Sequence, residues 1–198
     1  MNKKSSATAS AAATARRLTP APRLVLTLAL CLALALVLGS CSEGGWREFS
    51  SEEGGFSILL PVQPEAQTEA VATGAGEIDL NLFIAETEEK TAYFVSYADY
   101  PRSVVSEADP YAILAGARDA TLKAQNGRPR SDYRLRLGGH PGIEFTADVE
   151  VGGREAVLWA RNYLVGSRLY QTFAMAYRGR EPYEEMERFF HSFRVMER

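Results

Sequence analysis

The sequence predicts an α+β domain, an antiparallel sheet flanked by helices. Three observations lead to this fold class. Several segments alternate apolar and polar residues, as half-buried strands do. Two of the loops between such segments have only two residues, and loops that short can join only antiparallel strands. Two other segments repeat apolar residues at helical spacing.

The first strands are expected in the N-terminal half of this domain. Residues 56–60 alternate and end before Pro61. The second strand has apolar residues at every other position, and so does the third. These residues are Ile78, Leu80, Leu82 and Ile84, then Tyr93, Val95 and Tyr97.

Two helices are expected, each with a recognisable start. Asp109 is a good N-cap and Pro110 suits the first helical position, so a helix is predicted near 109–126. Asn126-Gly127 supplies its C-terminal stop. The second helix should begin near Glu181-Pro182. Its apolar stripe consists of Tyr183, Met186, Phe190 and Phe193.

The region between the helices predicts two hairpins with a defined register. Gly138-Gly-His-Pro-Gly142 is interpreted as a turn, and Gly152-Gly153 and Gly166-Ser167 as two-residue hairpin loops. Such loops fix the cross-strand pairs. The expected pairs are Val151 with Arg154, Phe145 with Ala160, Ile143 with Asn162, Leu164 with Leu169 and Leu158 with Met175.

This register sorts the hairpin residues onto two faces. The core face should carry Ile143, Phe145, Ala147, Val149, Leu158, Ala160, Leu164, Leu169, Phe173 and Met175. On the other face, Glu144 should pair with Arg161, and Tyr163 with Tyr170. Because exposed Trp, Tyr and Arg are typical of binding hot spots, this face is the candidate binding surface. The alternative is that another layer covers it. The candidate residues are Glu144, Trp159, Arg161, Tyr163, Arg168 and Tyr170.

The N-terminal segment has the pattern of an export signal. An apolar run over 24–38 follows Lys and Arg residues and ends at Leu38-Gly-Ser-Cys41. This ending resembles the bacterial lipobox, which implies cleavage before Cys41 and its diacylation. A transmembrane helix is the alternative, but this run spans fifteen residues, fewer than the roughly 20 that a bilayer needs. A plain secretory signal with an incidental Cys41 is the other.

The predicted organisation is therefore a cleaved signal over 1–40, a lipidated tether over 41–45 and a single domain over 46–198. The first 40 residues hold five of the 22 Lys and Arg and no Asp or Glu, so residues 41–198 carry a formal net charge of −8. An acidic domain without a basic stripe is a poor nucleic-acid binder. Of the two cysteines, Cys31 should leave with the signal and Cys41 should carry the lipid. A disulfide or a cysteine nucleophile is therefore excluded in the mature chain.

Several motifs along the domain resemble the PsbP-like proteins, including uncharacterised bacterial members. They are Trp46-Arg-Glu-Phe49, Gly54-Gly-Phe56-Ser-Ile-Leu-Leu60, Tyr93-Phe-Val-Ser-Tyr97, Gly139-His-Pro-Gly142-Ile-Glu144, Arg161-Asn-Tyr163, Arg168-Leu-Tyr170-Gln and Phe190-His-Ser-Phe193. The resemblance covers most of 46–196 and implies an α/β sandwich. Family members in photosynthetic membranes bind a large photosystem complex, with metal ions implicated, but none of their metal-binding residues can be matched here.

The sequence offers little for catalysis or for metal binding. His140 and His191 are the only histidines, with no metal-ligand spacing between them, so neither a metal nor another cofactor is expected. Ser167 and Ser192 lack the context of a nucleophile elbow. Glu144 and Asp148, four apart on one strand, are interpreted as solvated residues rather than an acid–base pair.

We therefore expect a non-enzyme: a lipid-anchored, extracytoplasmic binding or assembly module that recognises an envelope protein. The membrane is reached through lipid on Cys41, and no nucleic acid is involved. The alternative is capture of a small ligand between helix and sheet, and an unrecognised hydrolase is the third hypothesis. Ser42 after the lipidated cysteine favours the outer membrane if the host is Gram-negative.

Overall fold

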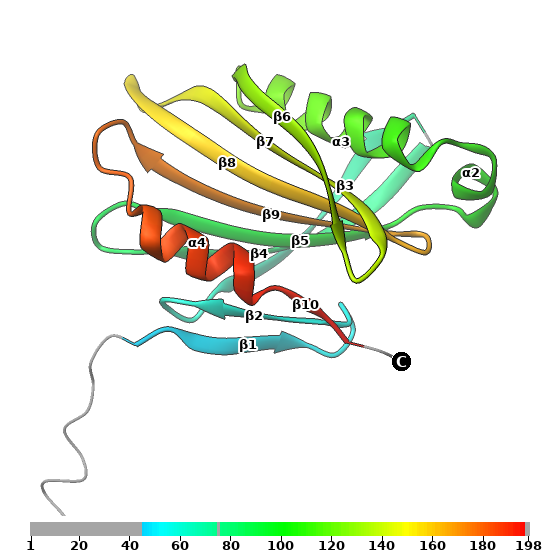
Figure 1. Ribbon diagram of the computed structural model, residues 1–198, viewed down its shortest axis with the longest axis horizontal. Helices are drawn as coiled ribbons and strands as arrows, with labels where there is room; N and C mark the ends of the chain where they lie inside the picture. The colour runs from blue at the N-terminus through cyan, green and yellow to red at the C-terminus, as the bar shows by residue number, and fades with distance from the viewer. Residues whose placement is uncertain (1–44, 75, 197–198) are drawn as a thin grey trace, which may run out of the picture. The chain divides into compact units, whose positions relative to one another are not determined.

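The computed structural model describes residues 45–74 and 76–196, which form two antiparallel sheets and three helices (Figure 1). The signal, Cys41 and all of the tether except Gly45 lie outside the described residues. No helix of the described part is long and apolar enough to span a membrane. The elements are β1 Arg47–Ser51, β2 Phe56–Leu60, β3 Glu65–Thr73, β4 Gly76–Glu86, β5 Ala92–Asp99, α2 Arg102–Glu107, α3 Pro110–Ala124, β6 Arg128–Leu137, β7 His140–Val151, β8 Arg154–Val165, β9 Arg168–Tyr177, α4 Tyr183–Ser192 and β10 Arg194–Val195.

The larger sheet has seven strands in the order β3-β4-β5-β9-β8-β7-β6, and every neighbouring pair is antiparallel. Both predicted hairpins are confirmed. All the expected pairs occur, including Phe145 with Ala160 and Leu158 with Met175. The two-residue loops therefore fixed the register, as their geometry requires.

The β6–β7 connection is shorter than the sequence suggested. Leu137 pairs with His140, so the turn is Gly138-Gly139 alone, with φ of 55° and 90°. Positive φ at both central positions is the type I′ geometry that glycine adopts without strain. The prediction of His140 as a turn residue is wrong, because His140 is the first residue of β7.

The helix near 109–126 is confirmed, with both of its caps. The Asp109 side chain accepts a hydrogen bond from the Tyr111 backbone N–H at 3.0 Å. At the other end Asn126 has φ of 47°, and the Gly127 N–H donates to the Leu122 carbonyl at 2.7 Å. Together with the Asn126 N–H on the Lys123 carbonyl, this is a Schellman stop.

The C-terminal helix is also confirmed as α4, with two changes to its buried stripe. Met186 and Phe190 are buried as expected, and Phe193 is buried directly after the helix. The sequence interpretation missed Phe189, which is fully buried. Tyr183, which was assigned to the stripe, is exposed.

Two cores lie on opposite faces of the larger sheet. The first lies beneath α3 and contains the predicted core face, including Phe145, Ala147 and Leu158, with Phe173 and Met175 packed at its border. The second lies between the sheet and a layer made of α4 and the small sheet β1-β2-β10 (Figure 1). This layer packs on the face that was proposed as a binding surface.

The second core is rich in aromatic residues, with Phe56 of β2 at its centre. Its ring lies within 6.4 Å, centroid to centroid, of five others: Phe49, Phe83, Tyr97, Tyr170 and Phe193. Burial of a ring this large contributes heavily to stability, and edge-to-face pairs add to it. The small layer is therefore held by a core of its own.

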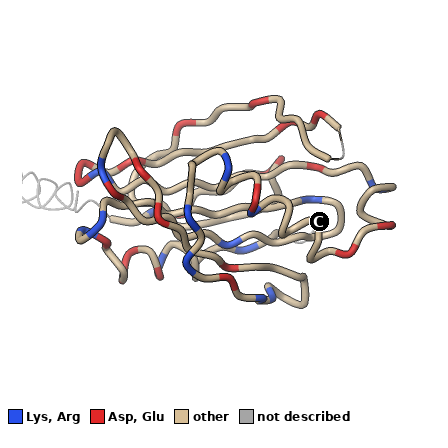
Figure 2. Tube along the Cα trace, turned by 90° about the horizontal axis from the view of Figure 1, so that it is seen from above, with Lys and Arg blue, Asp and Glu red and all other residues tan. Residues whose placement is uncertain are grey.

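The structure contains several elements that the sequence interpretation did not assign: β1, β3, α2 and β10. β3 is almost entirely exposed, so it has no buried residues to produce an alternating pattern. β1, α2 and β10 have six residues or fewer, too few to establish a period. The charged residues give no further guide, since basic and acidic positions are interspersed along the trace (Figure 2).

Gly142 in β7 is required by close packing rather than by its backbone angles. A Cβ at this position would lie 2.6 Å from the Tyr163 Cδ1 atom, 2.8 Å from the Leu135 Cδ1 atom and 2.9 Å from the Asn162 carbonyl oxygen. We predict that Gly142→Ala lowers the free energy of unfolding by about 1–3 kcal/mol, measured by urea denaturation.

Gly116 in α3 is the matched control, because a Cβ there meets no atom within 4 Å. Gly116→Ala should raise stability by about 0.5–1 kcal/mol through helix propensity. Equal effects of the two substitutions would contradict the packing assigned to β7.

Candidate binding surface

The six residues predicted from the hairpin register divide into two groups in the structure. Tyr163, Arg168 and Tyr170 lie under or against the small layer. Glu144, Trp159 and Arg161 lie beside α4 and are only partly buried. The register placed all six on one face correctly, but the two groups have different roles.

Arg168 at the start of β9 holds the β1–β2 turn. Its guanidinium donates to the Glu53 and Gly54 carbonyls at 2.7 and 2.8 Å, and it forms a two-point contact with the Asp99 carboxylate at 2.7 and 2.6 Å. It also lies 4.5 Å from the Tyr97 ring centroid. The hydrogen bonds to Asp99 raise the pKa of Arg168, which keeps it charged. Only arginine offers this planar set of donors.

The two tyrosines belong to the interior. The Tyr170 hydroxyl donates to the Gly54 carbonyl at 2.7 Å, next to the contact from Arg168. Tyr163 stacks on Phe193, with ring centroids 5.7 Å apart and planes 4° from parallel. Burial raises the pKa of Tyr163.

The expectation of an exposed face is therefore wrong at Tyr163 and Tyr170, which are 4% and 3% exposed. The reason is the β1–β2 hairpin. The sequence interpretation recognised only its second strand and did not place it over the sheet. The alternative considered there, a covering layer, is what the structure shows on this part of the face.

The other three residues surround the edge of α4. Arg161 donates to Glu144 at 2.5 Å, which confirms the predicted cross-strand pair. Arg161 also lies 3.8 Å from the Glu187 carboxylate and 5.0 Å from the Phe190 ring centroid, so it attaches α4 to β8. The Trp159 ring meets the Tyr183 ring edge-on, with centroids 5.9 Å apart.

Two exposed tyrosines complete this region. Tyr133 of β6 pairs with Glu144 and is 63% exposed, and Tyr183 at the start of α4 is 61% exposed. They are the two exposed aromatic residues of the described chain. We call the set Tyr133, Glu144, Trp159, Arg161 and Tyr183 the β6–α4 surface. The sequence interpretation did not include Tyr133 in the surface, because its alternation with Arg134 indicates a strand but does not show which residues of that strand are exposed.

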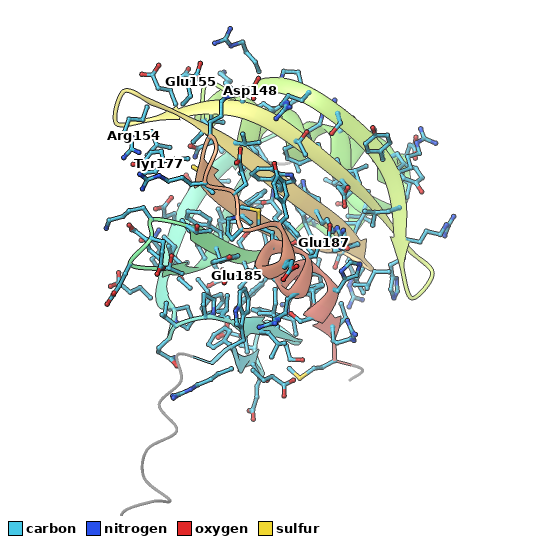
Figure 3. All side chains as sticks on the ribbon, turned by 60° about the vertical axis from the view of Figure 1, so that its left-hand side comes forward. Asp148, Arg154, Glu155, Tyr177, Glu185 and Glu187 are labelled. Atoms are coloured by element: carbon cyan, nitrogen blue, oxygen red, sulfur yellow. The ribbon has the colours of Figure 1, made fainter. Side chains whose placement is uncertain are left out.

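A shallow hollow of about 40 Å³ lies within this surface, between α4 and β8. It is too small to enclose a drug-sized ligand, since ligand pockets occupy about 300–1,000 Å³. Figure 3 shows Glu185 and Glu187 projecting from α4, while Asp148 and Glu155 lie at the far end of β7 and β8. The surface is therefore suited to contact with a macromolecule rather than to enclosure of a metabolite.

The polar groups considered for catalysis have structural contacts. The Ser192 hydroxyl accepts from the Leu59 N–H at 2.8 Å and donates to the Phe189 carbonyl at 2.7 Å, which attaches α4 to β2. Asp148 is ion-paired with Arg178 at 2.6 Å and is not free to act with Glu144. Within the described residues, no group of three or more His, Cys, Asp or Glu is placed to hold a metal ion.

A separate groove of about 460 Å³ lies on the other side of the sheet, between α3, α2 and the end of β3. None of its lining residues is charged. The lining residues are Ala72, Thr73, Gly74, Tyr100, Val104, Ala108, Ala112, Ile113, Gly116, Ala117 and Ala120. This groove corresponds to the cleft between helix and sheet considered for a small ligand.

Comparison with known proteins identifies the fold. No family model matches the chain, and neither does any curated protein sequence. Among solved structures, the cyanobacterial PsbP protein (CyanoP) of Synechocystis sp. PCC 6803 is similar over 80% of this chain and 99% of its own, with 14% identity and a TM-score of 0.52. The domain has a PsbP-like fold.

The expected fold class is thereby confirmed. The PsbP-like domain is also similar to LpqN of Mycobacterium tuberculosis, described as involved in cell envelope biogenesis, over 77% of this chain and 91% of that chain, with 11% identity and a TM-score of 0.48. A protein of Pseudomonas aeruginosa, PA94, is similar over 71% of this chain and 89% of its own, with 13% identity and a TM-score of 0.42.

The role of Arg168 in the PsbP-like domain can be tested by Arg168→Lys. Lysine keeps the charge but cannot reach Asp99 and both turn carbonyls together. We predict a loss of about 1–3 kcal/mol in the free energy of unfolding, measured by urea denaturation. Most of it should come from the turn carbonyls, because Asp99 is 58% exposed and such ion pairs contribute little.

Arg154→Lys is the control, since the Arg154 guanidinium lies over the ring of Tyr177, 3.7 Å from its centroid, and its side chain donates to no turn carbonyl among the described residues. It should change stability by less than about 0.5 kcal/mol. Equal stability of the Arg168 variant and the unsubstituted protein would show that Arg168 does not fasten the small layer.

Proposed function

We propose that this protein is a lipid-anchored, extracytoplasmic envelope lipoprotein whose PsbP-like domain acts as a non-catalytic protein-binding or assembly module. The observation that carries the proposal is the β6–α4 surface. There, two tyrosines that are each more than 60% exposed flank a partly buried tryptophan and an Arg–Glu pair.

The composition of this surface supports protein recognition. Interface hot spots are enriched in Trp, Tyr and Arg, and tyrosine offers a large contact area with few rotatable bonds. Arg161 and Glu144 are already paired, so a partner can cover them without leaving a charge unpaired. A partner seated on α4 and β8 would also bury the exposed ring faces of Tyr133 and Tyr183.

The location is proposed from the sequence. The lipobox ending at Cys41 supports anchoring by lipid, and the short tether over 41–45 would keep the domain next to the membrane. The partner would then be an envelope protein. Ser42 favours the outer membrane if the host is Gram-negative.

The test is partner capture with the two exposed tyrosines changed. The full-length lipoprotein is crosslinked in cells and affinity-captured, and recovered proteins are quantified by mass spectrometry. Tyr133→Ala/Tyr183→Ala should reduce recovery of the dominant envelope partner about tenfold or more, because each ring is a candidate hot spot. The melting temperature of this variant should stay within about 2 °C of that of the unsubstituted protein, because exposed side chains contribute little to folding stability.

Val62→Ala is the matched control, since Val62 is also an exposed apolar residue, 43% exposed, but lies in the β2–β3 connection. It should leave recovery unchanged. Undiminished recovery with the tyrosine variant would refute the assignment of this surface.

The groove beside α3 supports a second function, capture of a small apolar ligand. Its volume of about 460 Å³ lies in the range of ligand pockets, and its lining offers apolar contact. Gly116 lines the groove and a Cβ there meets no atom within 4 Å, so Gly116→Leu would extend a side chain into the groove.

Native mass spectrometry of the purified full-length protein should then detect a bound molecule that is lost in Gly116→Leu. The control Ala115→Leu substitutes a neighbouring helix residue that does not line the groove. No bound molecule in either protein would exclude the second function, and it would leave the first untouched.

A further inference from the structure

The two edges of the seven-stranded sheet carry opposite charges. Its edge strands are β3 and β6, and among the described residues neither has a second neighbour. The exposed charged residues of β6 are mainly arginines, and those of β3 are glutamates. Unpaired edges present backbone donors and acceptors that can pair with another strand.

On β6 the arginines next to the hairpin turn have no carboxylate partner among the described residues. Arg134 lies over the Tyr111 ring at 4.2 Å, and Arg136 donates to the Gly139 carbonyl at 2.7 Å. The one acidic residue of this strand, Asp132, is ion-paired with Arg118 of α3. The positive charge of the edge is therefore available to another molecule.

On β3 the charged residues are Glu65 and Glu69. Both are exposed, and neither makes an ion pair within the described part of the chain. Glu65 is the cross-strand partner of Ile84, and Ile84 in turn pairs with Phe94. This row continues to Phe173, which packs against the core under α3.

The charges of the two edges lie on the same face of the sheet. Arg134 pairs with Ile143, a residue of the core under α3, and Arg136 is two positions further along the same strand. The glutamates share this face through the row that reaches Phe173. A strand of one copy placed beside the opposite edge of another would therefore bring arginines and glutamates together on one side.

The direction of the strands permits this arrangement. The sheet has seven strands and every neighbouring pair is antiparallel, so the first and last strands run in the same direction. Continuing the sheet from one copy into the next thus places β6 parallel to β3, with the faces matched, and the twist of the sheet rotates each copy relative to the one before it.

We propose that β6 of one copy pairs with β3 of the next, so that the protein self-associates head to tail through its sheet edges. This interaction uses the backbone edge of β6 and the face that carries Arg134, whereas Tyr133 of the β6–α4 surface lies on the opposite face of that strand, and it goes beyond the proposed function. It is a heterologous contact, which forms rings or open helical chains rather than two-fold dimers. Pairing of β6 with β6, or of β3 with β3, is opposed by like charges.

The test uses two charge-reversed variants of the full-length protein in mild detergent, followed by sedimentation velocity over a range of concentrations. Arg134→Glu/Arg136→Glu makes both edges acidic, and Glu65→Arg/Glu69→Arg makes both edges basic. Each variant alone should self-associate about tenfold or more weakly than the unsubstituted protein. An equimolar mixture of the two should recover association, because each edge again meets an opposite charge.

The control Glu88→Arg/Glu107→Arg makes the same change in net charge as Glu65→Arg/Glu69→Arg, at two exposed positions that lie outside both edge strands. It should associate normally. The arginine-reversed variant keeps an acidic β3 and should add only to the β6 end of the control's chains, so this mixture should form shorter chains than the mixture of the two reversed variants. Association of the unsubstituted protein should weaken near 1 M salt, where the Debye length is about 3 Å.

Two results would overturn the proposal. One is a monomeric unsubstituted protein at every concentration in low salt. The other is a mixture of the two reversed variants that associates no better than either alone. Circular dichroism of each variant confirms that the fold is retained, so that loss of association cannot be attributed to unfolding.

Discussion

The contact on which the rest of this structure depends is the docking of the β1–β2 hairpin on the larger sheet. Phe56 fills the centre of the aromatic core, and Arg168 and Tyr170 hold the carbonyls of the adjoining turn. β10 pairs with β2, and the Ser192 hydroxyl at the end of α4 accepts from the Leu59 N–H, so the C-terminal elements are fixed through the same hairpin. Without it, one face of a seven-stranded sheet would expose its aromatic residues to water.

This docking divides the face of the sheet and so creates the candidate surface. The hairpin and α4 cover the part around Tyr163 and Tyr170. They leave the part between α4 and β6 open, where Tyr133 and Tyr183 are exposed. Arg161 lies at the boundary, because it both pairs with Glu144 and contacts α4. Arg161 therefore belongs both to the contacts that hold α4 on the sheet and to the surface that can meet a partner.

Local signals in the sequence predicted most of the sheet. The glycine loops determined the register from β7 to β9, and Asp109 and Asn126 marked the ends of α3. What could not be predicted depends on contacts between distant segments. A periodic pattern shows that Tyr163 and Trp159 share a face. It does not show that the small layer, which includes β2 from a hundred residues earlier, covers Tyr163 and leaves Trp159 only partly buried. β3 escaped recognition because an exposed edge strand has no buried side.

The most direct test of this account is site-specific photo-crosslinking in cells, with the photoreactive residue placed in turn at positions 133, 183, 163 and 170. The account predicts that positions 133 and 183 crosslink to one envelope protein. Positions 163 and 170 should give no crosslink to another protein, because the small layer covers them. Crosslinks to a partner from 163 or 170, with none from 133 or 183, would show that the partner binds under the small layer and would contradict the account.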